Sequence, residues 1–484
     1  MSTPADVLAA YLDATRERRL QRYMDYIRIP SISGIPAHAP DCRRAAEVLA
    51  GELSEAGLEH VETCETGGHP VVYADWLGAG PEAPTVLVYA HYDVQPVDPV
   101  ELWSHAPFEP AVRDGRMLGR GSSDDKAQVQ MHVRAAEAVL AIRGAFPVNL
   151  RYVFEGEEEA SSEHLDAWLE ANRGRLAADL AVISDTAFFD GNLPAITVGL
   201  RGICYAQIDV EGPTVDLHSG SYGGAVVNPA TALCSIIAAL KGPDGHVRIP
   251  GFYDDVVPLT ERDREAFAGL PFDEAAWMAG MGVDALAGEV GYTTLERRSA
   301  RPTLDVNGIW GGFTGEGPKT IIPAHAHAKV SCRLVAGQDP EKILAAIRAF
   351  VAEIAPPGVR VRVQDLGKGR PSLTPIDHPA TQAAARAIEA TFGRAPLYFR
   401  EGGSIPVAAS FEAILGLPVV LLGFANPDSR AHAPDESMVM DNFETGIRTI
   451  ARYWDELAAL PASALQAQAP PRTLGRAVLG GPGG

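Results

Sequence analysis

The chain has 484 residues, of which 46% are hydrophobic and 21% are charged, a composition typical of soluble globular proteins. This length predicts two domains rather than a single core. The formal net charge of −21 argues against a nucleic-acid partner, because contacts to phosphates need a basic face. No apolar run approaches the roughly 20 residues that cross a bilayer, so no membrane partner is expected.

Two features predict a cytoplasmic location. The first residues carry charges where a signal peptide needs an apolar segment, which argues against export. The cysteines are dispersed and form no C-x-x-C pattern, which predicts reduced thiols and argues against a zinc ion held by sulfur. The five are Cys42, Cys64, Cys204, Cys234 and Cys332.

The N-terminal part of the chain combines helices and strands. Apolar spacing predicts helices over residues 5–28 and 41–56, and β-forming runs predict strands over 71–77 and 85–89. Residues 95–119 contain proline, tryptophan and glycine without periodicity, so we expect a surface loop there.

His91 and Asp93 follow the second of these strands directly. Open α/β sheets bind ligands at the carboxyl ends of their strands, where an imidazole can face the crevice. A carboxylate two residues later can hold the other ring nitrogen, as metal-bound histidines usually require. Alone, the H-x-D pattern favours a polar loop, and only the segments downstream change that interpretation.

Residues 119–140 predict a tight loop that leads into a helix. The glycines begin like a dinucleotide-binding G-x-G-x-x-G, but the pattern fails at Asp124, so we reject that interpretation. Two adjacent aspartates at a helix start, here Asp124 and Asp125, are usually caps. The apolar positions are spaced for one buried helix face, formed by Val129, Val133, Ala136 and Leu140.

Three predicted strands end in acidic residues. The strand over 85–89 leads to Asp93, the strand over 148–154 leads into the sequence EGEEEASS, residues 155–162, and the run 181–185 ends at Asp185. Several carboxylates this close together repel one another unless a cation lies among them. A solvated acidic turn explains one such loop, but three strand ends together with His91 favour a metal-binding crevice at the edge of an α/β sheet.

The pattern changes after residue 200. The alternation over 205–210 predicts a half-exposed antiparallel strand, and a helix is expected over 228–241. Residues 242–318 are rich in loops and allow no placement of elements. A strand at 328–334, a helix at 340–353 and a strand at 359–365 complete an inserted α+β region.

The α/β style returns after Pro371. Helices are expected over 378–392 and 404–414, then a strand over 418–422 and a long helix from Asn442. His432 lies beyond the insertion, shortly after a strand, in position to return to the same crevice. The end of the chain has no packing pattern and predicts a mobile tail over 466–484.

Five segments in the same order carry a family resemblance: His91-x-Asp93, Ser123-Asp-Asp-Lys126, Glu158-Glu159, Ser184-Asp185 and His432-Ala-Pro-Asp-Glu436. Together they resemble the co-catalytic dizinc peptidases, the family of carnosinase-type dipeptidases, succinyl-diaminopimelate desuccinylase, aminoacylase and carboxypeptidase-G-type enzymes. Four further segments, around Asp216, Thr320, Arg333 and Glu401, resemble the carnosinase-type branch most closely.

The resemblance implies an α/β catalytic domain with a central, mostly parallel sheet, interrupted by an inserted α+β lid and dimerisation domain. On this interpretation residues 1–200 and 374–465 form the metal-binding catalytic domain, and residues 201–373 form the lid. It also implies a homodimer that contacts its partner through the lid.

The resemblance further implies two divalent ions per chain. Asp124 would bridge both ions, with a cis peptide bond to Asp125. His91 and Asp185 would complete one ligand set, and Glu159 and His432 the other. Three protein ligands with an open position are typical of catalytic zinc, although nitrogen and oxygen ligands also allow manganese or cobalt.

Glu158 would be the general base that takes a proton from the water bridging the metals, and Asp93 would support His91. Amide hydrolysis needs one carboxylate that is not a ligand, because the leaving amine must be protonated. The pair Glu158-Glu159 is preferred over the pair beginning at Glu157 because of the family's spacing to the next small residue and serine. A shift by one position stays open.

In the lid, the resemblance implies that His218 reaches across the dimer to stabilise the oxyanion. Arg333 would bind a substrate carboxylate, because its planar fork suits bidentate pairing. Further predicted substrate contacts are Thr320, Gly403 and Ser404. The chain departs from the family pattern at Ala127 and at Ala160-Ser161, where small residues replace the usual ones.

The predicted function is hydrolysis of an amide bond in dipeptides or short peptides with a free carboxylate. An N-acyl-amino-acid deacylase using the same site stays open, as does an inactive metal-binding regulator. Retention of Glu158 argues against the regulator, because metal binding alone does not need a base. A serine hydrolase is disfavoured because the chain has no G-x-S-x-G.

Overall fold

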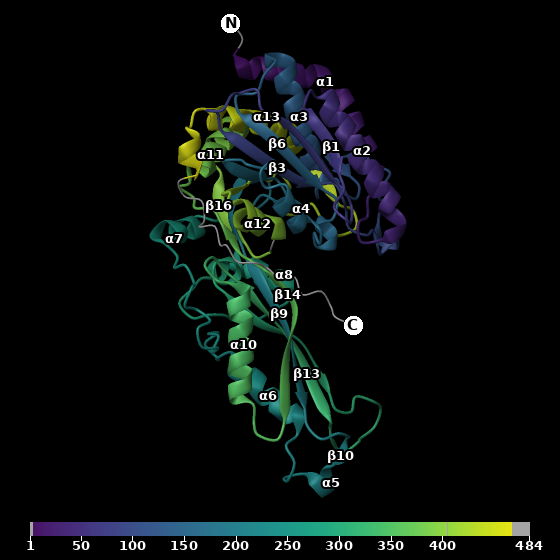
Figure 1. The fold of residues 1–484 in the computed structure, drawn as a ribbon, viewed down its shortest axis with the longest axis vertical. Helices are drawn as coiled ribbons and strands as arrows, with labels where there is room; N and C mark the ends of the chain where they lie inside the picture. Colours follow the sequence, from purple (N-terminus) through teal and green to yellow (C-terminus); the bar gives the residue numbers. More distant parts are fainter. Residues whose placement is uncertain (1–2, 404, 467–484) are drawn as a thin grey trace. The chain divides into compact units, whose positions relative to one another are not determined.

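A computed structural model describes residues 3–403 and 405–466, which form two compact units (Figure 1). Unit 1 comprises Met1–Val198, Thr374–Phe399 and Ser410–Gly484, and unit 2 comprises Gly199–Leu373 and Arg400–Ala409. Residues 400–409 therefore pack with the inserted segment, whereas the sequence placed them with the flanking domain. Most of the predicted tail lies outside the described residues, as does Ser404.

The core of unit 1 is a mixed sheet with the strand order β1-β2-β6-β3-β7-β17-β8. Its middle strands β6, β3, β7 and β17 run parallel, and the outer strands pair antiparallel. This arrangement confirms the predicted α/β class. The strand bounds are β1 Glu59–Cys64, β2 Val71–Trp76, β3 Thr85–His91, β6 Asn149–Glu155, β7 Leu180–Ile183, β8 Ala195–Leu200 and β17 Val419–Leu421.

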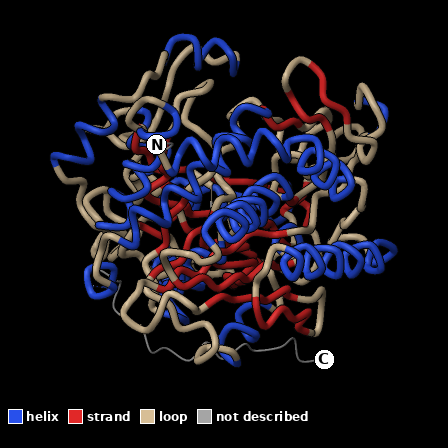
Figure 2. Tube along the Cα trace, turned by 90° about the horizontal axis from the view of Figure 1, so that it is seen from above, coloured by secondary structure: helices blue, strands red, loops and turns tan. Residues whose placement is uncertain are grey.

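Helices cover this sheet, with the strands (red) running beneath and between helices (blue) in Figure 2. Helix α2 contacts β1 and β2, and α3 contacts β3 and is itself covered by α1 and α13. Helix α3 is therefore buried almost all round, not on one face as its spacing suggested. The bounds are α1 Pro4–Ile27, α2 Ala39–Glu55, α3 Lys126–Arg143, α4 Leu165–Ala171, α11 Pro379–Phe392, α13 Met440–Ala458 and α14 Ala462–Gln466.

Two expectations for the connections were wrong in detail. The predicted loop 95–119 contains the 3-10 turn η2 (Val100–Leu102) and two short strands, β4 (Ala111–Arg113) and β5 (Arg116–Leu118). Strand β5 pairs with β4 on one side and with β18 (Ser437–Val439) on the other, so one of its partners lies far along the chain. The predicted helix 404–414 is a short helix, α12 (Pro406–Ser410), followed by a π-helical turn, η4 (Phe411–Leu415).

Unit 2 is built on a four-stranded antiparallel sheet in the order β11-β13-β9-β14. Alternate residues of β9 and β13 pack against helices α6 and α10 on one face, while the other face is not covered by these helices (Figure 1). The bounds are β9 Gly202–Glu211, β11 Thr303–Gly311, β13 His325–Leu334, β14 Arg360–Gly369, α6 Pro229–Leu240 and α10 Pro340–Ile354.

The remaining elements are short. Strands β10 (Leu217–His218) and β12 (Ile321–Ile322) form a two-stranded sheet next to the turn α5 (Ser219–Tyr222). The segment that the sequence left unplaced contains α7 (Glu261–Ala268), α8 (Glu274–Met281) and α9 (Thr294–Ser299), and β15 (Ser372–Leu373) and β16 (Leu397–Glu401) pair with β8. In the described part of the chain, no helix is long and apolar enough to cross a membrane.

Candidate metal centre

The parallel strands of unit 1 bring three of the predicted acidic loops to one edge of the sheet. His91 is the last residue of β3 and lies opposite Glu155, the last residue of β6. Tyr89 of β3 lies opposite Ile183, the last residue of β7, so Asp185 follows at the same edge. Parallel strands end on the same side, which is why segments distant in sequence meet here.

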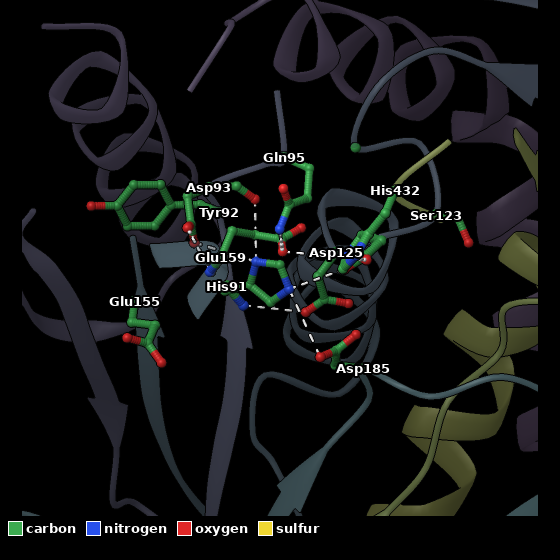
Figure 3. Close-up of polar contacts among 12 residues, drawn as sticks. His91, Tyr92, Asp93, Gln95, Ser123, Asp125, Glu155, Glu159, Asp185 and His432 are labelled. Carbon is green, nitrogen blue, oxygen red and sulfur yellow. Dashed lines mark hydrogen bonds and ion pairs between the residues drawn. The ribbon is translucent and has the colours of Figure 1, made fainter. Parts of the chain in front are cut away.

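The first group of candidate ligands is His91, Asp124 and Asp185. His91 Nε2 lies 3.1 Å from Asp124 Oδ1 and 3.8 Å from Asp185 Oδ2. Asp124 comes from the loop before α3, and its peptide bond to Asp125 is cis, as the resemblance implied. In Figure 3 the labelled side chains of His91 and Asp185 point toward one another from different elements.

The second group is Asp124, Glu159 and His432. His432 Nε2 lies 2.9 Å from Asp124 Oδ2 and 3.2 Å from Glu159 Oε2. Within each group the potential ligand atoms lie within 4.8 Å of one another. Asp124 belongs to both groups, because its Oδ1 faces His91 and its Oδ2 faces His432. Together the two groups contain the five residues predicted as ligands.

The donor set fits two divalent ions. Each group offers one imidazole nitrogen and two carboxylate oxygens, a combination suited to zinc, manganese or cobalt. Glu159 Oε1 is buried without a hydrogen-bond partner among the described residues, and buried carboxylate oxygens are costly unless a cation or donor meets them. None of the cysteines belongs to either group, in agreement with the expected nitrogen and oxygen ligands.

The titration behaviour shows how strongly these groups interact without a metal. Hydrogen bonds to Asp124 and Glu159 raise the pKa of His432 to about 10. Burial opposes protonation of His91, yet its contacts with Asp124 and Asp93 raise its pKa well above the usual value. Burial and the charge of Asp124 raise the pKa of Asp185 to about 7. Protons therefore occupy positions where a divalent cation would bind instead.

Asp93 contacts one residue of each ligand group. One carboxylate oxygen lies 3.3 Å from His91 Nδ1, and the other accepts the backbone N–H of Glu159 at 3.0 Å. Asp93 is completely buried. The backbone carbonyl of Asp93 also lies 3.2 Å from His91 Nδ1, so Asp93 can orient the ring through its backbone and its carboxylate and can fix the backbone from which Glu159 projects.

The three consecutive glutamates 157–159 point in different directions. Glu157 accepts the backbone N–H of His69 at 3.0 Å and lies 3.0 Å from His164 Nδ1, away from the ligand groups. Glu159 belongs to the second ligand group. Glu158 is half-buried, and burial followed by the charges of Asp185 and Glu159 raises its pKa to about 9. Bound divalent cations would lower that pKa, because they oppose the nearby negative charges.

Sequence reasoning missed several residues that contact the centre. Gln95 donates its side-chain N–H to Glu159 Oε2 at 2.7 Å (Figure 3). Glu436 was quoted as part of a motif but received no role, and its carboxylate accepts the backbone N–H of Asp124 at 3.0 Å. The only signal for Gln95 was its place four residues after His91, and that spacing has no chemical meaning of its own.

In unit 2, His218 and Thr320 lie next to each other. His218 pairs with Ile321 across β10 and β12, and the carbonyl of Thr320 accepts the N–H of Ser219 at 3.1 Å. Both side chains are exposed. His218 Nδ1 accepts the N–H of Gly220 at 3.0 Å, so the neutral ring carries its proton on Nε2, where it can donate to a ligand.

Arg333 and Gly403 lie elsewhere in unit 2, near an arginine that sequence reasoning missed. Arg333 is paired with Ile203 across β13 and β9, on the sheet face away from α6 and α10. Arg201 donates through Nε to Gly402 O at 3.0 Å and through its backbone N–H to Gly403 O at 3.1 Å. Burial and the like charge of Arg333 lower the pKa of Arg201 to about 10. Unit 2 thus gathers two guanidinium groups beside a glycine loop.

Comparisons with known proteins agree on one family. A profile described as peptidase family M20/M25/M40 matches residues 87–456. The Cys-Gly metallodipeptidase of Schizosaccharomyces pombe is 34% identical over 475 residues, covering 95% of this chain and 100% of that protein. Human Beta-Ala-His dipeptidase is 30% identical, covering 93% and 92%. The metallo-carboxypeptidase Sso-CP2 of Sulfolobus solfataricus has a similar structure, with a TM-score of 0.77, 31% identity and coverage of 91% and 99%.

Proposed function

The chain belongs to peptidase family M20/M25/M40, and we propose that it hydrolyses dipeptides or short peptides that keep a free carboxylate. The family is the one that the five motifs indicated, and membership makes the chain a metallopeptidase. One observation carries the proposal: two candidate ligand groups share Asp124, and a glutamate outside both groups, Glu158, lies close enough that burial and the charges of Asp185 and Glu159 together raise its pKa. The names of its relatives, a Cys-Gly dipeptidase and a Beta-Ala-His dipeptidase, support dipeptides as the substrate class.

In this proposal the residues of unit 1 divide the work of amide hydrolysis. Two divalent ions, when held by His91, Asp124, Asp185, Glu159 and His432, supply an activated water and positive charge for the amide oxygen. Glu158 takes a proton from the attacking water and delivers it to the leaving nitrogen. Asp93 keeps the His91 ring in place through Nδ1.

The residues of unit 2 recognise the substrate in this proposal. The Nε2–H of His218 donates to the oxyanion, and the forked guanidinium of Arg333 binds the free carboxylate. Arg201 supports this role because it adds a second positive charge, close enough to Arg333 that burial and the like charge of Arg333 together lower its pKa. The backbone of Gly403 and the side chains of Thr320 and Ser404 complete the proposed contacts.

We propose zinc as the metal, with manganese and cobalt as alternatives, and a cytoplasmic homodimer as the active form. Unit 1 would be the catalytic domain and unit 2 the lid and dimerisation domain. Exposed His218 and Thr320 support this assembly, because side chains that face solvent are available for contact with a second subunit.

The decisive experiment is a substrate screen of the purified enzyme reconstituted with zinc, manganese or cobalt. The panel contains dipeptides, the same dipeptides with an amidated carboxyl end, and N-acyl amino acids. We expect hydrolysis of free dipeptides and poor hydrolysis of their amides. Preferential cleavage of N-acyl amino acids would identify a deacylase, and no turnover by metal-loaded protein would contradict an enzymatic role.

A further inference from the structure

The side chain of Glu436 is completely buried and collects hydrogen bonds from one loop. Its Oε2 accepts the N–H of Gly121 at 2.9 Å, and its Oε1 accepts the N–H groups of Ser123 at 2.7 Å and Asp124 at 3.0 Å. Backbone N–H groups that converge in this way usually bind an anion. Here the anion is the protein's own carboxylate, and the loop that closes around it carries Asp124.

Arg120 neutralises this carboxylate and connects it to a further segment. Its Nη1 donates to Glu436 Oε2 at 2.8 Å, and both side chains are almost fully buried. Its Nη2 donates to Pro96 O at 3.1 Å, and its guanidinium lies over the Trp103 ring, 5.3 Å from the centroid. Pro96 directly follows Gln95, which donates to Glu159.

The Arg120–Glu436 pair therefore joins three segments that carry groups of the metal centre. One segment follows His91 and contains Gln95, the second contains Asp124, and the third contains His432 four residues before Glu436. The backbone strengthens the connection, since Gly119 N–H donates to Glu436 O at 3.0 Å. Neither Arg120 nor Glu436 belongs to a candidate ligand group.

We infer that the buried Arg120–Glu436 pair is a positioning element that sets the spacing between Asp124 and His432 and so determines metal affinity. This inference rests on the proposed metal centre but not on any substrate. Asp124 and His432 come from opposite parts of the chain, and their 2.9 Å contact depends on how the two loops are held. Groups that orient metal ligands typically change metal affinity 10–100-fold when they are mutated.

The change Glu436→Gln keeps the shape of the side chain but replaces one acceptor oxygen with an NH₂ group that donates. The new amide NH₂ would face either the Ser123 and Asp124 N–H groups or Gly121 and Arg120, and every one of these is a donor. The loop must then shift to relieve the donor–donor contact. The ion shared by Asp124, Glu159 and His432 should be affected most, because the displaced loops carry two of its three ligands.

Glu52 offers a matched control in the same unit. Its buried carboxylate accepts Arg134 Nη2 at 2.6 Å and Gln130 Nε2 at 2.7 Å, and it contacts none of the candidate ligands. Glu52→Gln therefore perturbs a buried arginine pair of similar kind without touching the ligand loops. A purely structural role of Glu436 would make the two variants behave alike.

The test measures zinc affinity by chelator competition and zinc content by elemental analysis, using wild type, Glu436→Gln, Arg120→Lys and Glu52→Gln. The thermal midpoint of each metal-free protein is recorded alongside. We expect the zinc affinity of at least one site to fall 10–100-fold in Glu436→Gln. The zinc affinity of Arg120→Lys should lie between those of Glu436→Gln and wild type, and Glu52→Gln should bind both ions with wild-type affinity.

Wild-type affinity in Glu436→Gln, or an equal loss in Glu52→Gln, would overturn the inference. Should Glu436→Gln fail to fold, Arg120→Lys decides, since it retains the charge and should still weaken zinc binding; unchanged affinity there would overturn the inference. Zinc binding is measured without substrate, so a wild-type protein that binds zinc but cleaves no peptide would contradict only the proposed function.

Discussion

The candidate ligands of unit 1 and the proposed substrate contacts of unit 2 are held in different ways. His91 is completely buried and His432 is exposed, but both ligand groups are tied to other side chains or to the backbone of a neighbouring loop. His218 and Thr320 are exposed, and within the described ranges the side chain of His218 forms a hydrogen bond with Gly220 in its own turn. One region is assembled within a single unit, whereas the other presents groups to solvent.

This difference corresponds to two chemical demands. Metal ligands must be fixed before the ion arrives, because each misplaced carboxylate leaves an uncompensated buried charge. Residues that contact a substrate can be completed by the substrate or by a second subunit. Unit 1 should therefore control metal binding and proton transfer, and unit 2 should control substrate choice and stabilisation of the oxyanion. Four predictions test this division.

The largest effect is expected at Glu158. Glu158→Gln should lower kcat by at least 10²–10⁴-fold, the range typical of general acid–base catalysis, while metal content stays nearly unchanged. Glu159→Gln is the neighbouring control and should instead lose metal, because Glu159 lies 3.2 Å from His432. Kinetics and elemental analysis of both variants check this. Opposite phenotypes for the two residues would place the base one position later.

The same comparison shows what the sequence can and cannot predict about the site. His91, Asp124, Glu159, Asp185 and His432 were identified because they stand at strand ends or in ordered motifs, and both are local patterns. The roles of Arg120 and Gln95 could not be inferred, because each depends on a contact with a segment far along the chain. Glu436 lies 312 residues from its partner Asp124, and only the folded chain reveals that hydrogen bond.

The fold could be predicted where burial leaves a local sequence pattern, and it could not be predicted where an element depends on other segments. Apolar runs such as β3 and alternation such as that in β9 predicted strands, because burial imposes those periods directly. The short strands β4 and β5 were missed because a three-residue strand has no measurable period; they pair with each other, and β5 also pairs with the distant β18. Residues 400–409 were assigned to the wrong unit because Arg201 holds that loop through Gly402 and Gly403, a contact that composition does not encode.

A second prediction concerns Arg333 and the substrate carboxylate. Amidating a dipeptide should lower kcat/KM of the wild-type enzyme about a hundredfold or more, because hydrogen bonds to charged groups contribute about 1.5–3 kcal/mol each. Arg333→Ala should already be poor on the free acid and lose much less on amidation. Arg360→Ala is the control: Arg360 is an exposed arginine of unit 2 paired with Glu211 at 3.4 Å. Equal losses on amidation in wild type and Arg333→Ala would show that another group reads the carboxylate.

A third prediction tests whether unit 2 acts on a second subunit. Two inactive variants, His218→Ala and Glu158→Ala, should regain part of the wild-type activity when mixed and allowed to exchange subunits. A mixed dimer contains one site with intact Glu158 and an intact His218 from the partner, so at most a minority of sites recover. Activity is followed together with native mass spectrometry of the mixture. Proven exchange without recovery would place His218 in its own chain's site or outside catalysis.

The smallest effect is the link between protons and metal binding in unit 1. The pKa of His432 is raised to about 10 in the metal-free protein, so at pH 8 its ring is protonated, and a metal must displace that proton. Metal affinity should therefore rise with pH up to about 10. The stability of the metal-free fold should change in the opposite direction. Because the folded-state pKa of His432 is raised, its protonated ring stabilises the fold fully below the ordinary pKa of about 6.5, and this stabilisation is lost as pH rises through about 10.

Calorimetry of zinc binding in buffers of different ionisation enthalpy counts the protons released, and His432→Ala should release about one fewer than wild type. An unchanged proton count would mean that His432 does not exchange its proton for the ion, and the second ligand group would lose its imidazole.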